Sequence, residues 1–305
     1  MTESSQRNLL RYFLALIIIF VLIACRIGSF PINATPPSSS TSFPVQPTEF
    51  TFPTVSLGSE VTIPDPQFDE TFPETFPEDS IWIQAPENGA KISGILSVQG
   101  ISDPTFEQNL VFRLVDQNNN EVLRANTIIQ SDAGSRGDFS TAIEIPLTSS
   151  QPGILQVYSV SPKDGSLVHL SSVSVVINSD NGEGSPSARN ERILVNSVKG
   201  NGTGTDAVIE VTGEAWGLFE NTLNYTVCGE RSGNIPDLVC GTMENRLMDG
   251  VITTDATEMG LPGEFAISIS NIHTFPSSAS LVIYSISPMN GSIDHAVSHQ
   301  LFGNE

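Results

Sequence analysis

Basic side chains are scarce in this sequence. Only 13 of the 305 residues are lysine or arginine, against 34 aspartates and glutamates, and the formal net charge is −21 at pH 7. Nucleic-acid binding depends on basic side chains that neutralise phosphates, and anionic lipid headgroups repel an acidic surface. The composition therefore predicts no nucleic-acid partner. It indicates an exposed surface kept soluble by negative charge, with cationic wall polymers or Ca²⁺ as partners in the alternative explanation.

Cysteine and histidine are rarer still, with 3 and 4 residues. Zinc sites group these side chains at short, fixed spacings, and Cys228 and Cys240 have no histidine near them in the sequence. His273 and His299 are isolated. We therefore predict no metal site and no cofactor. In an oxidising compartment Cys228 and Cys240 are instead expected to form a disulfide, which would contribute roughly 3 kcal/mol by closing its loop.

The chain has one long apolar run, from Tyr12 to Ala24, which is shorter than the roughly 20 residues that span a bilayer. It follows Arg7 and Arg11, so residues 1–25 have the pattern of a secretion signal. Leu22-Ile-Ala-Cys25 resembles the lipobox of bacterial lipoproteins. That resemblance implies cleavage before Cys25, lipidation of its thiol and anchoring at the extracytoplasmic face of a bacterial cell membrane, with an uncleaved membrane helix as the alternative.

Helical periodicity is absent after residue 25. Residues 26–80 are rich in proline, serine, threonine and phenylalanine, with Thr-Phe-Pro recurring at Thr51, Thr71 and Thr75. This composition predicts a disordered tether. Its phenylalanines leave open a second possibility, that the segment docks on a partner or on the chain's own domains.

A fifteen-residue phrase occurs twice, beginning at Leu155 and at Leu281 and ending at His169 and at His295. Each copy is an alternating apolar strand, an Asp-Gly or Asn-Gly turn and a second strand, which is a strong hairpin signal. Self-similarity of this kind indicates a duplicated unit.

Alternating apolar residues and frequent turn signals predict an all-β protein. We expect two tandem immunoglobulin-like β-sandwich domains, at 81–177 and 192–302, joined by a polar linker at 178–191. The second copy carries an insertion that holds both Cys228 and Cys240.

Several short motifs of the first copy occur in a characteristic order: Pro86-x-x-Gly89, Gly100, Phe106-Glu107, Leu110, Asp116, Gly137-x-Phe139 and Asp164-Gly165-Ser166. In this order they resemble the immunoglobulin-like domain associated with bacterial spore-germination proteins. The resemblance is looser in 192–302, where the opening Pro-x-x-Gly is absent. It implies a secreted or lipoprotein context and no catalytic activity, and it is no evidence for a role in germination.

Glu107 and Glu220 each follow a phenylalanine at matching positions. They are candidate ligand-binding carboxylates. The favoured alternative is that Phe106 and Phe219 anchor a loop to the core while the carboxylates accept backbone N–H groups.

His169 and His295 lie close to Ser166 and Ser292 in the sequence, but a hydrolytic triad needs an oriented nucleophile and an oxyanion site, of which there is no sign. We interpret both as strand histidines beside a turn. Residues 116–121 offer oxygen side chains but lack the glycine and the terminal glutamate of a calcium loop, so a hairpin turn is expected.

Trp216 follows a predicted strand, where its ring would either stack on a sugar or cap the sandwich. The sequence therefore predicts a non-enzymatic surface lipoprotein that presents two immunoglobulin-like domains to an unidentified envelope polymer or protein. The alternative is a carbohydrate-binding module that acts through loops of the second domain. A passive spacer is the third possibility, because fold alone does not decide function.

Overall fold

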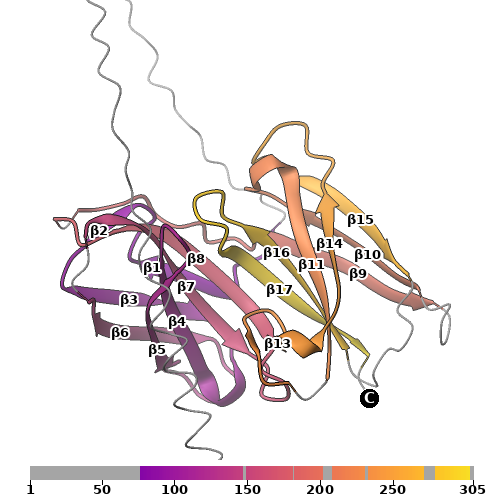
Figure 1. Ribbon diagram of the computed structural model, residues 1–305, viewed down its shortest axis with the longest axis horizontal. Helices are drawn as coiled ribbons and strands as arrows, with labels where there is room; N and C mark the ends of the chain where they lie inside the picture. Colours follow the sequence, from indigo (N-terminus) through magenta and orange to yellow (C-terminus); the bar gives the residue numbers. More distant parts are fainter. Residues whose placement is uncertain are drawn as a thin grey trace, which may run out of the picture. The chain divides into compact units, whose positions relative to one another are not determined.

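The computed structural model describes residues 76–146, 149–180, 182–201, 208–230, 233–270 and 279–302 (Figure 1). All of them belong to one compact unit, Gln67–Glu305. The predicted signal 1–25, its Cys25 and the tether up to residue 75 lie outside the described residues. No helix in the described ranges is both long enough and apolar enough to cross a membrane.

The described chain is all β, as predicted, and its first part is a two-sheet sandwich. One sheet has the order β1-β3-β6 and the other ends with the order β8-β7-β4-β5, with β2 added in parallel to β8. The strands are β1 (Ile81–Ala85), β2 (Ala90–Ile92), β3 (Ile95–Ser102), β4 (Asn109–Asp116), β5 (Glu121–Ile128), β6 (Gly137–Glu144), β7 (Gln151–Val160) and β8 (Leu167–Ile177).

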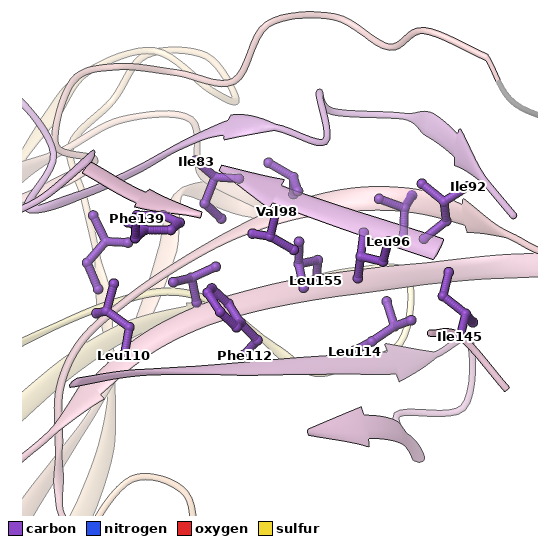
Figure 2. Packing of buried hydrophobic residues seen from close by; sticks show 14 of the residues in the cluster. Ile83, Ile92, Leu96, Val98, Leu110, Phe112, Leu114, Phe139, Ile145 and Leu155 are labelled. Carbon is purple, nitrogen blue, oxygen red and sulfur yellow. The ribbon is translucent and has the colours of Figure 1, made fainter. Parts of the chain in front are cut away.

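The core of this sandwich fills the space between the sheets (Figure 2). Buried residues alternate along β3 and β4, as in Leu96 and Val98, because successive side chains of a strand point to opposite faces. The Phe112 and Phe139 rings meet across the sheets at 5.9 Å. Gly100 allows this packing, since a Cβ there would lie 2.4 Å from the Phe139 ring.

The second part repeats this strand order. Its sheets run β9-β10-β15 and β17-β16-β11-β14. The strands are β9 (Ile193–Asn201), β10 (Val208–Ala215), β11 (Thr222–Gly229), β14 (Arg246–Thr253), β15 (Gly263–Ile269), β16 (Ala279–Ile286) and β17 (Ile293–Phe302). Gly213 lies under the Phe265 ring as Gly100 lies under that of Phe139.

The insertion of the second copy forms a small hairpin of β12 (Pro236–Asp237) and β13 (Gly241–Thr242). Cys228 and Cys240 form a disulfide with 5.4 Å between their Cα atoms. Both cysteines are buried, so the bridge ties the insertion to the end of β11.

The two sandwiches share a sheet. Strand β17 pairs antiparallel with β8 at Ala296–Leu170 and Val297–His169, which joins the larger sheets into one of nine strands (Figure 1). A hydrophobic cluster also crosses the boundary, with members from both sandwiches: Tyr158, Leu167 and Leu170 from the first, and Cys228, Val239, Cys240, Val282, Tyr284, Ile293 and Ala296 from the second. The two hairpins of the repeated phrase therefore pack against each other, and we call this boundary the seam.

Polar contacts reinforce the seam. The Gln156 side chain is fully buried and its amide donates to the Ile293 carbonyl at 2.6 Å. The Leu167 amide donates to the carbonyl of Val239, in the insertion, at 2.8 Å. The insertion is thus an interdomain contact rather than a free loop.

Residues 76–80, the end of the predicted tether, and parts of the linker 178–191 are packed against the sandwiches, whereas tether residues 26–75 lie outside the described residues. Phe76 is buried and its ring meets the edge of Trp216 at 6.2 Å. Isolated antiparallel β-bridges join the backbone of Glu78 to that of Asn190, Asn88 to Ser185 and Lys91 to Gly182. The tether's last residues therefore dock on the chain's own domains.

Candidate functional site

Four buried ionisable side chains meet at the seam: Asp79, His169, Glu191 and His295. Each is at most 6% exposed, and one ligand atom from each lies within 4.8 Å of the others. His169 comes from β8 and His295 from β17, while Asp79 precedes β1 and Glu191 precedes β9. Each sandwich thus supplies one histidine and one carboxylate, and we call this group the seam cluster.

The repeated strand order explains this arrangement. Asp79 lies two residues before Ile81 at the start of β1, and Glu191 lies two residues before Ile193 at the start of β9. The Ile81 amide donates to Asp79 Oδ1 at 2.9 Å, and the Ile193 amide donates to Glu191 Oε1 at 3.2 Å. Each carboxylate therefore caps the first strand of its own sandwich while it faces the histidine pair.

The histidines present the same nitrogen to the cluster. His169 Nε2 is 2.8 Å from Asp79 Oδ1 and 3.8 Å from Glu191 Oε2, and His295 Nε2 makes a very short contact with Glu191 Oε1. The two imidazole rings meet edge to face, with centroids 5.1 Å apart. Ser171, on the same face of β8, donates to Asp79 Oδ2 at 2.7 Å and orients that carboxylate.

Burial disfavours the charged forms of Glu191 and His169, but their partners outweigh it. Burial alone raises the pKa of Glu191, yet the charge and hydrogen bond of His295, with the charge of His169, lower it. Burial alone lowers the pKa of His169, yet its hydrogen bond and charge interaction with Asp79 raise it. These pKa shifts favour an ionised Glu191 carboxylate and a cationic His169.

The nearest other charges are already paired. Arg192 binds Asp294 at 2.6 Å within the second sandwich, and Ser172 of β8 donates to the same carboxylate at 2.7 Å across the seam. Arg136 pairs with Asp103 and donates to the Asp79 carbonyl. The two carboxylates of the cluster depend on their own histidines for compensation, since these neighbouring charges cancel one another.

The trio of Ser171, His169 and Asp79 does not have the geometry of a hydrolytic triad. Ser171 Oγ and Asp79 Oδ1 both face the same ring nitrogen, His169 Nε2, at 3.4 and 2.8 Å. A triad needs the serine on one imidazole nitrogen and the carboxylate on the other. The same nitrogen cannot serve both roles, so the trio is a hydrogen-bonded positioning network.

Glu107 and Glu220 occupy equivalent short 3₁₀ turns, Phe106–Gln108 and Phe219–Asn221. Both have positive φ, at 52° and 54°. The expectation that the preceding phenylalanines anchor these turns to the core is wrong, because Phe106 is 58% exposed and Phe219 46%.

Amide side chains hold the turns instead. Gln108 donates to the Ser131 carbonyl at 2.6 Å, and Asn221 donates to the Ala256 carbonyl at 3.0 Å. Ser131 lies in the connection between β5 and β6, and Ala256 lies in the equivalent connection between β14 and β15. The phenylalanine and glutamate of each turn are therefore left on the surface.

Trp216 is partly buried at the seam, where it donates from its ring nitrogen to the Glu191 carbonyl at 2.7 Å. It lines a cavity of about 350 Å³ that also reaches Asp79, Ser171 and His295.

Residues 116–121 form the turn of the β4–β5 hairpin, as expected, and Asp116 accepts hydrogen bonds from the amides of Asn118 and Asn120 at 2.8 Å each. The Asn120 hydrogen bond keeps the pKa of Asp116 below its usual value.

Residue spacings within one copy predict no metal site, and this stays a prediction. His169 and His295 are strand residues, as expected, but they belong to a cluster whose other members, Asp79 and Glu191, sequence reasoning did not single out. A usable signal was present. Each copy has an acidic residue two positions before its first strand and a histidine at the same point of the repeated phrase.

Residues 80–166 match the family described as the immunoglobulin-like domain of bacterial spore germination. The match covers the first sandwich from the start of β1 to the last hairpin turn. No curated protein is similar enough to count as a match.

Solved structures offer only distant likenesses. A DUF3823 family protein from Parabacteroides merdae is 9% identical, with 70% of this chain and 98% of that chain covered and a TM-score of 0.26. Red sea bream transglutaminase is 10% identical, with 75% and 32% covered and a TM-score of 0.24. The BSP domain of a biofilm associated protein is 15% identical, with 70% and 28% covered and a TM-score of 0.21. The fold assignment depends on the strand order and the family match.

Proposed function

We propose that this protein is a lipid-anchored surface protein that holds two immunoglobulin-like domains as one block and binds an envelope polymer or protein without catalysing a reaction. The lipobox at Cys25 and the tether after it support display at the extracytoplasmic face of a bacterial membrane. The shared sheet and the buried seam cluster support presentation of both domains in one orientation.

The observation that carries the binding function is the exposed Phe-Glu turn, which occurs once in each sandwich. Phe106 and Phe219 are large apolar side chains on the surface, each beside a glutamate in a left-handed conformation. Non-glycine residues in this conformation are uncommon and cluster at functional sites. A pair of equivalent apolar and acidic contacts suits a partner with repeated features, such as a wall polymer.

The carbohydrate-binding alternative, through Trp216 and the insertion 228–240, has less support. Trp216 donates its ring N–H to the Glu191 carbonyl, and its ring and that of Phe76 meet edge to face. The insertion contacts the first sandwich through Val239. Both features are engaged at the seam.

Co-sedimentation of the purified full chain with cell-wall sacculi from the producing bacterium tests the binding role. We expect the double variant Phe106→Ser/Phe219→Ser to lose most of the binding, because it removes both exposed rings. Ile128→Ser/Val251→Ser is the matched control, since it removes one exposed apolar side chain from each sandwich on other strands. Equal binding by the two double variants, or turnover of the wall polymer, would contradict the proposal.

The anchor has a separate test. Cys25→Ala should abolish labelling by radioactive palmitate and release the chain from the membrane fraction. A Cys25→Ala chain that remains membrane-bound would show that the N-terminal segment anchors it in another way.

A further inference from the structure

We propose that the seam cluster is a binding site for one divalent transition-metal ion, with zinc as the best match, and that the ion fastens the two sandwiches together. Asp79 and His169 from the first sandwich and Glu191 and His295 from the second would be its ligands. The site goes beyond the proposed binding function, because its four ligands are buried at the seam and none of them belongs to the exposed Phe-Glu turns.

The donor set fits zinc. Zinc takes four ligands from cysteine, histidine, aspartate and glutamate, at about 2.0–2.2 Å for nitrogen and oxygen. A tetrahedron of such bonds places its ligand atoms roughly 3.3–3.5 Å apart. The ligand atoms here lie within 4.8 Å of one another, and His169 Nε2 is 2.8 Å from Asp79 Oδ1 and 3.8 Å from Glu191 Oε2. Small rotations of these side chains would complete the geometry.

Charge supports the same conclusion. Two buried carboxylates carry two negative charges, and isolated buried charges are strongly unfavourable. The neighbouring arginines are engaged by Asp294 and Asp103, so they do not neutralise the cluster. A divalent cation would supply the compensation that the two histidines otherwise provide, and with two neutral imidazoles it makes the site electrically neutral.

The surroundings resemble those of a built metal site. Metal-binding carboxylates are usually held by further hydrogen bonds. Ser171 Oγ holds Asp79 Oδ2 at 2.7 Å, and the amides of Arg192 and Ile193 hold Glu191 Oε1 at 3.0 and 3.2 Å. These bonds fix both carboxylates before an ion arrives.

Two cavities border the site. The cavity of about 350 Å³ that Trp216 lines reaches Asp79 and His295. A second cavity, of about 430 Å³, is lined by His169 and Glu191 and also by His299. His299 is therefore close to the site without belonging to it.

The experiment is zinc binding by the full chain, purified from membranes in detergent and stripped with a chelator. We expect one Zn²⁺ per chain when ZnCl₂ is titrated, and X-ray absorption of the zinc-loaded chain should show two imidazole nitrogens and two oxygens. His169→Ala and His295→Ala should each weaken binding by at least about 100-fold, because even the loss of a group that only hydrogen-bonds a metal ligand costs about 10–100-fold. The matched control, His299→Ala, should bind as wild type does.

The wild-type spectrum keeps the test decisive even where a histidine variant fails to fold. Glu191→Gln removes the charge of one proposed ligand without changing the size of the side chain, so it should also weaken zinc binding. Absence of stoichiometric zinc binding by the stripped wild type would overturn the site. So would binding that persists in both histidine variants, or a zinc spectrum without imidazole. A chain that binds no zinc yet still binds sacculi would leave the proposed function standing, so the two proposals fail separately.

Discussion

Replacement of Gly241 by alanine is expected to force the seam apart at one defined point. Gly241 lies in the insertion with φ at +74°, and a Cβ there would lie 2.2 Å from the carbonyl oxygen of Asp164 in the other sandwich. Real Cβ atoms essentially never come closer than 3.0 Å to another heavy atom. The clash is with backbone, so it is relieved only when the insertion and the hairpin turn move apart.

The magnitude has two parts. A non-glycine residue in the left-handed region costs roughly 1–2 kcal/mol wherever it occurs. Separation of the two segments also breaks the hydrogen bond from the Leu167 amide to the Val239 carbonyl, worth about 1 kcal/mol, and loosens the apolar packing beside it. We expect Gly241→Ala to cost about 1–2 kcal/mol more than the left-handed strain alone.

Gly260→Ala is the matched control. Its φ is +85°, but a Cβ there would have no heavy atom within 4 Å, so it carries the strain without the clash. In thermal unfolding of the full chain, the midpoint of Gly241→Ala should fall roughly 2–8 °C below that of Gly260→Ala. Faster deuterium exchange at the Leu167 amide should accompany the shift. Equal midpoints and equal exchange would refute the docking of the insertion on the first sandwich.

Three further results are expected. Cys228→Ser/Cys240→Ser should lower the free energy of unfolding by about 3 kcal/mol in a urea titration, because the disulfide closes a loop of sequence separation 12. Reduction of the wild type should have the same effect. An unchanged urea midpoint would contradict this. Gln156→Ala should lower the free energy of unfolding by about 1–3 kcal/mol, since it leaves the buried Ile293 carbonyl without its donor. The control Gln99→Ala, at an exposed position, should change it by no more than about 0.5 kcal/mol. Similar losses of stability in the two variants would argue against the buried hydrogen bond. Burial lowers the pKa of His299, so as the pH falls below about 6.5 the unfolded chain protonates this histidine before the folded chain does, and stability is lost. His299→Gln should reduce that loss in unfolding curves between pH 7 and 5. An identical pH profile would count against it.

Much of the fold follows from local sequence. Alternation within segments such as Leu96 and Val98 predicts half-buried strands, and the repeated phrase predicts the last hairpin of each sandwich. Gly165 and Gly291 have φ of 73° and 72°, so the repeated glycine is explained by the turn. These features depend on neighbours in the chain, which is why the sequence alone reveals them.

The seam was not predictable in the same way. It depends on the open edges of β8 and β17 and on carboxylates that precede each sandwich, and no local spacing relates His169 to His295. The Phe-Glu turn was predicted with the wrong orientation, because the amide of Gln108, rather than the ring of Phe106, holds the loop. Contacts between copies and the orientation of a strained turn both require three-dimensional information.

Differential scanning calorimetry of the full chain tests the central claim most directly, namely that the two sandwiches form one block. A shared sheet, a common hydrophobic cluster and a buried ionisable cluster make separate unfolding of either sandwich costly. We predict a single transition whose calorimetric enthalpy equals the van't Hoff enthalpy. Two resolved transitions, each with the enthalpy of one sandwich, would contradict the account.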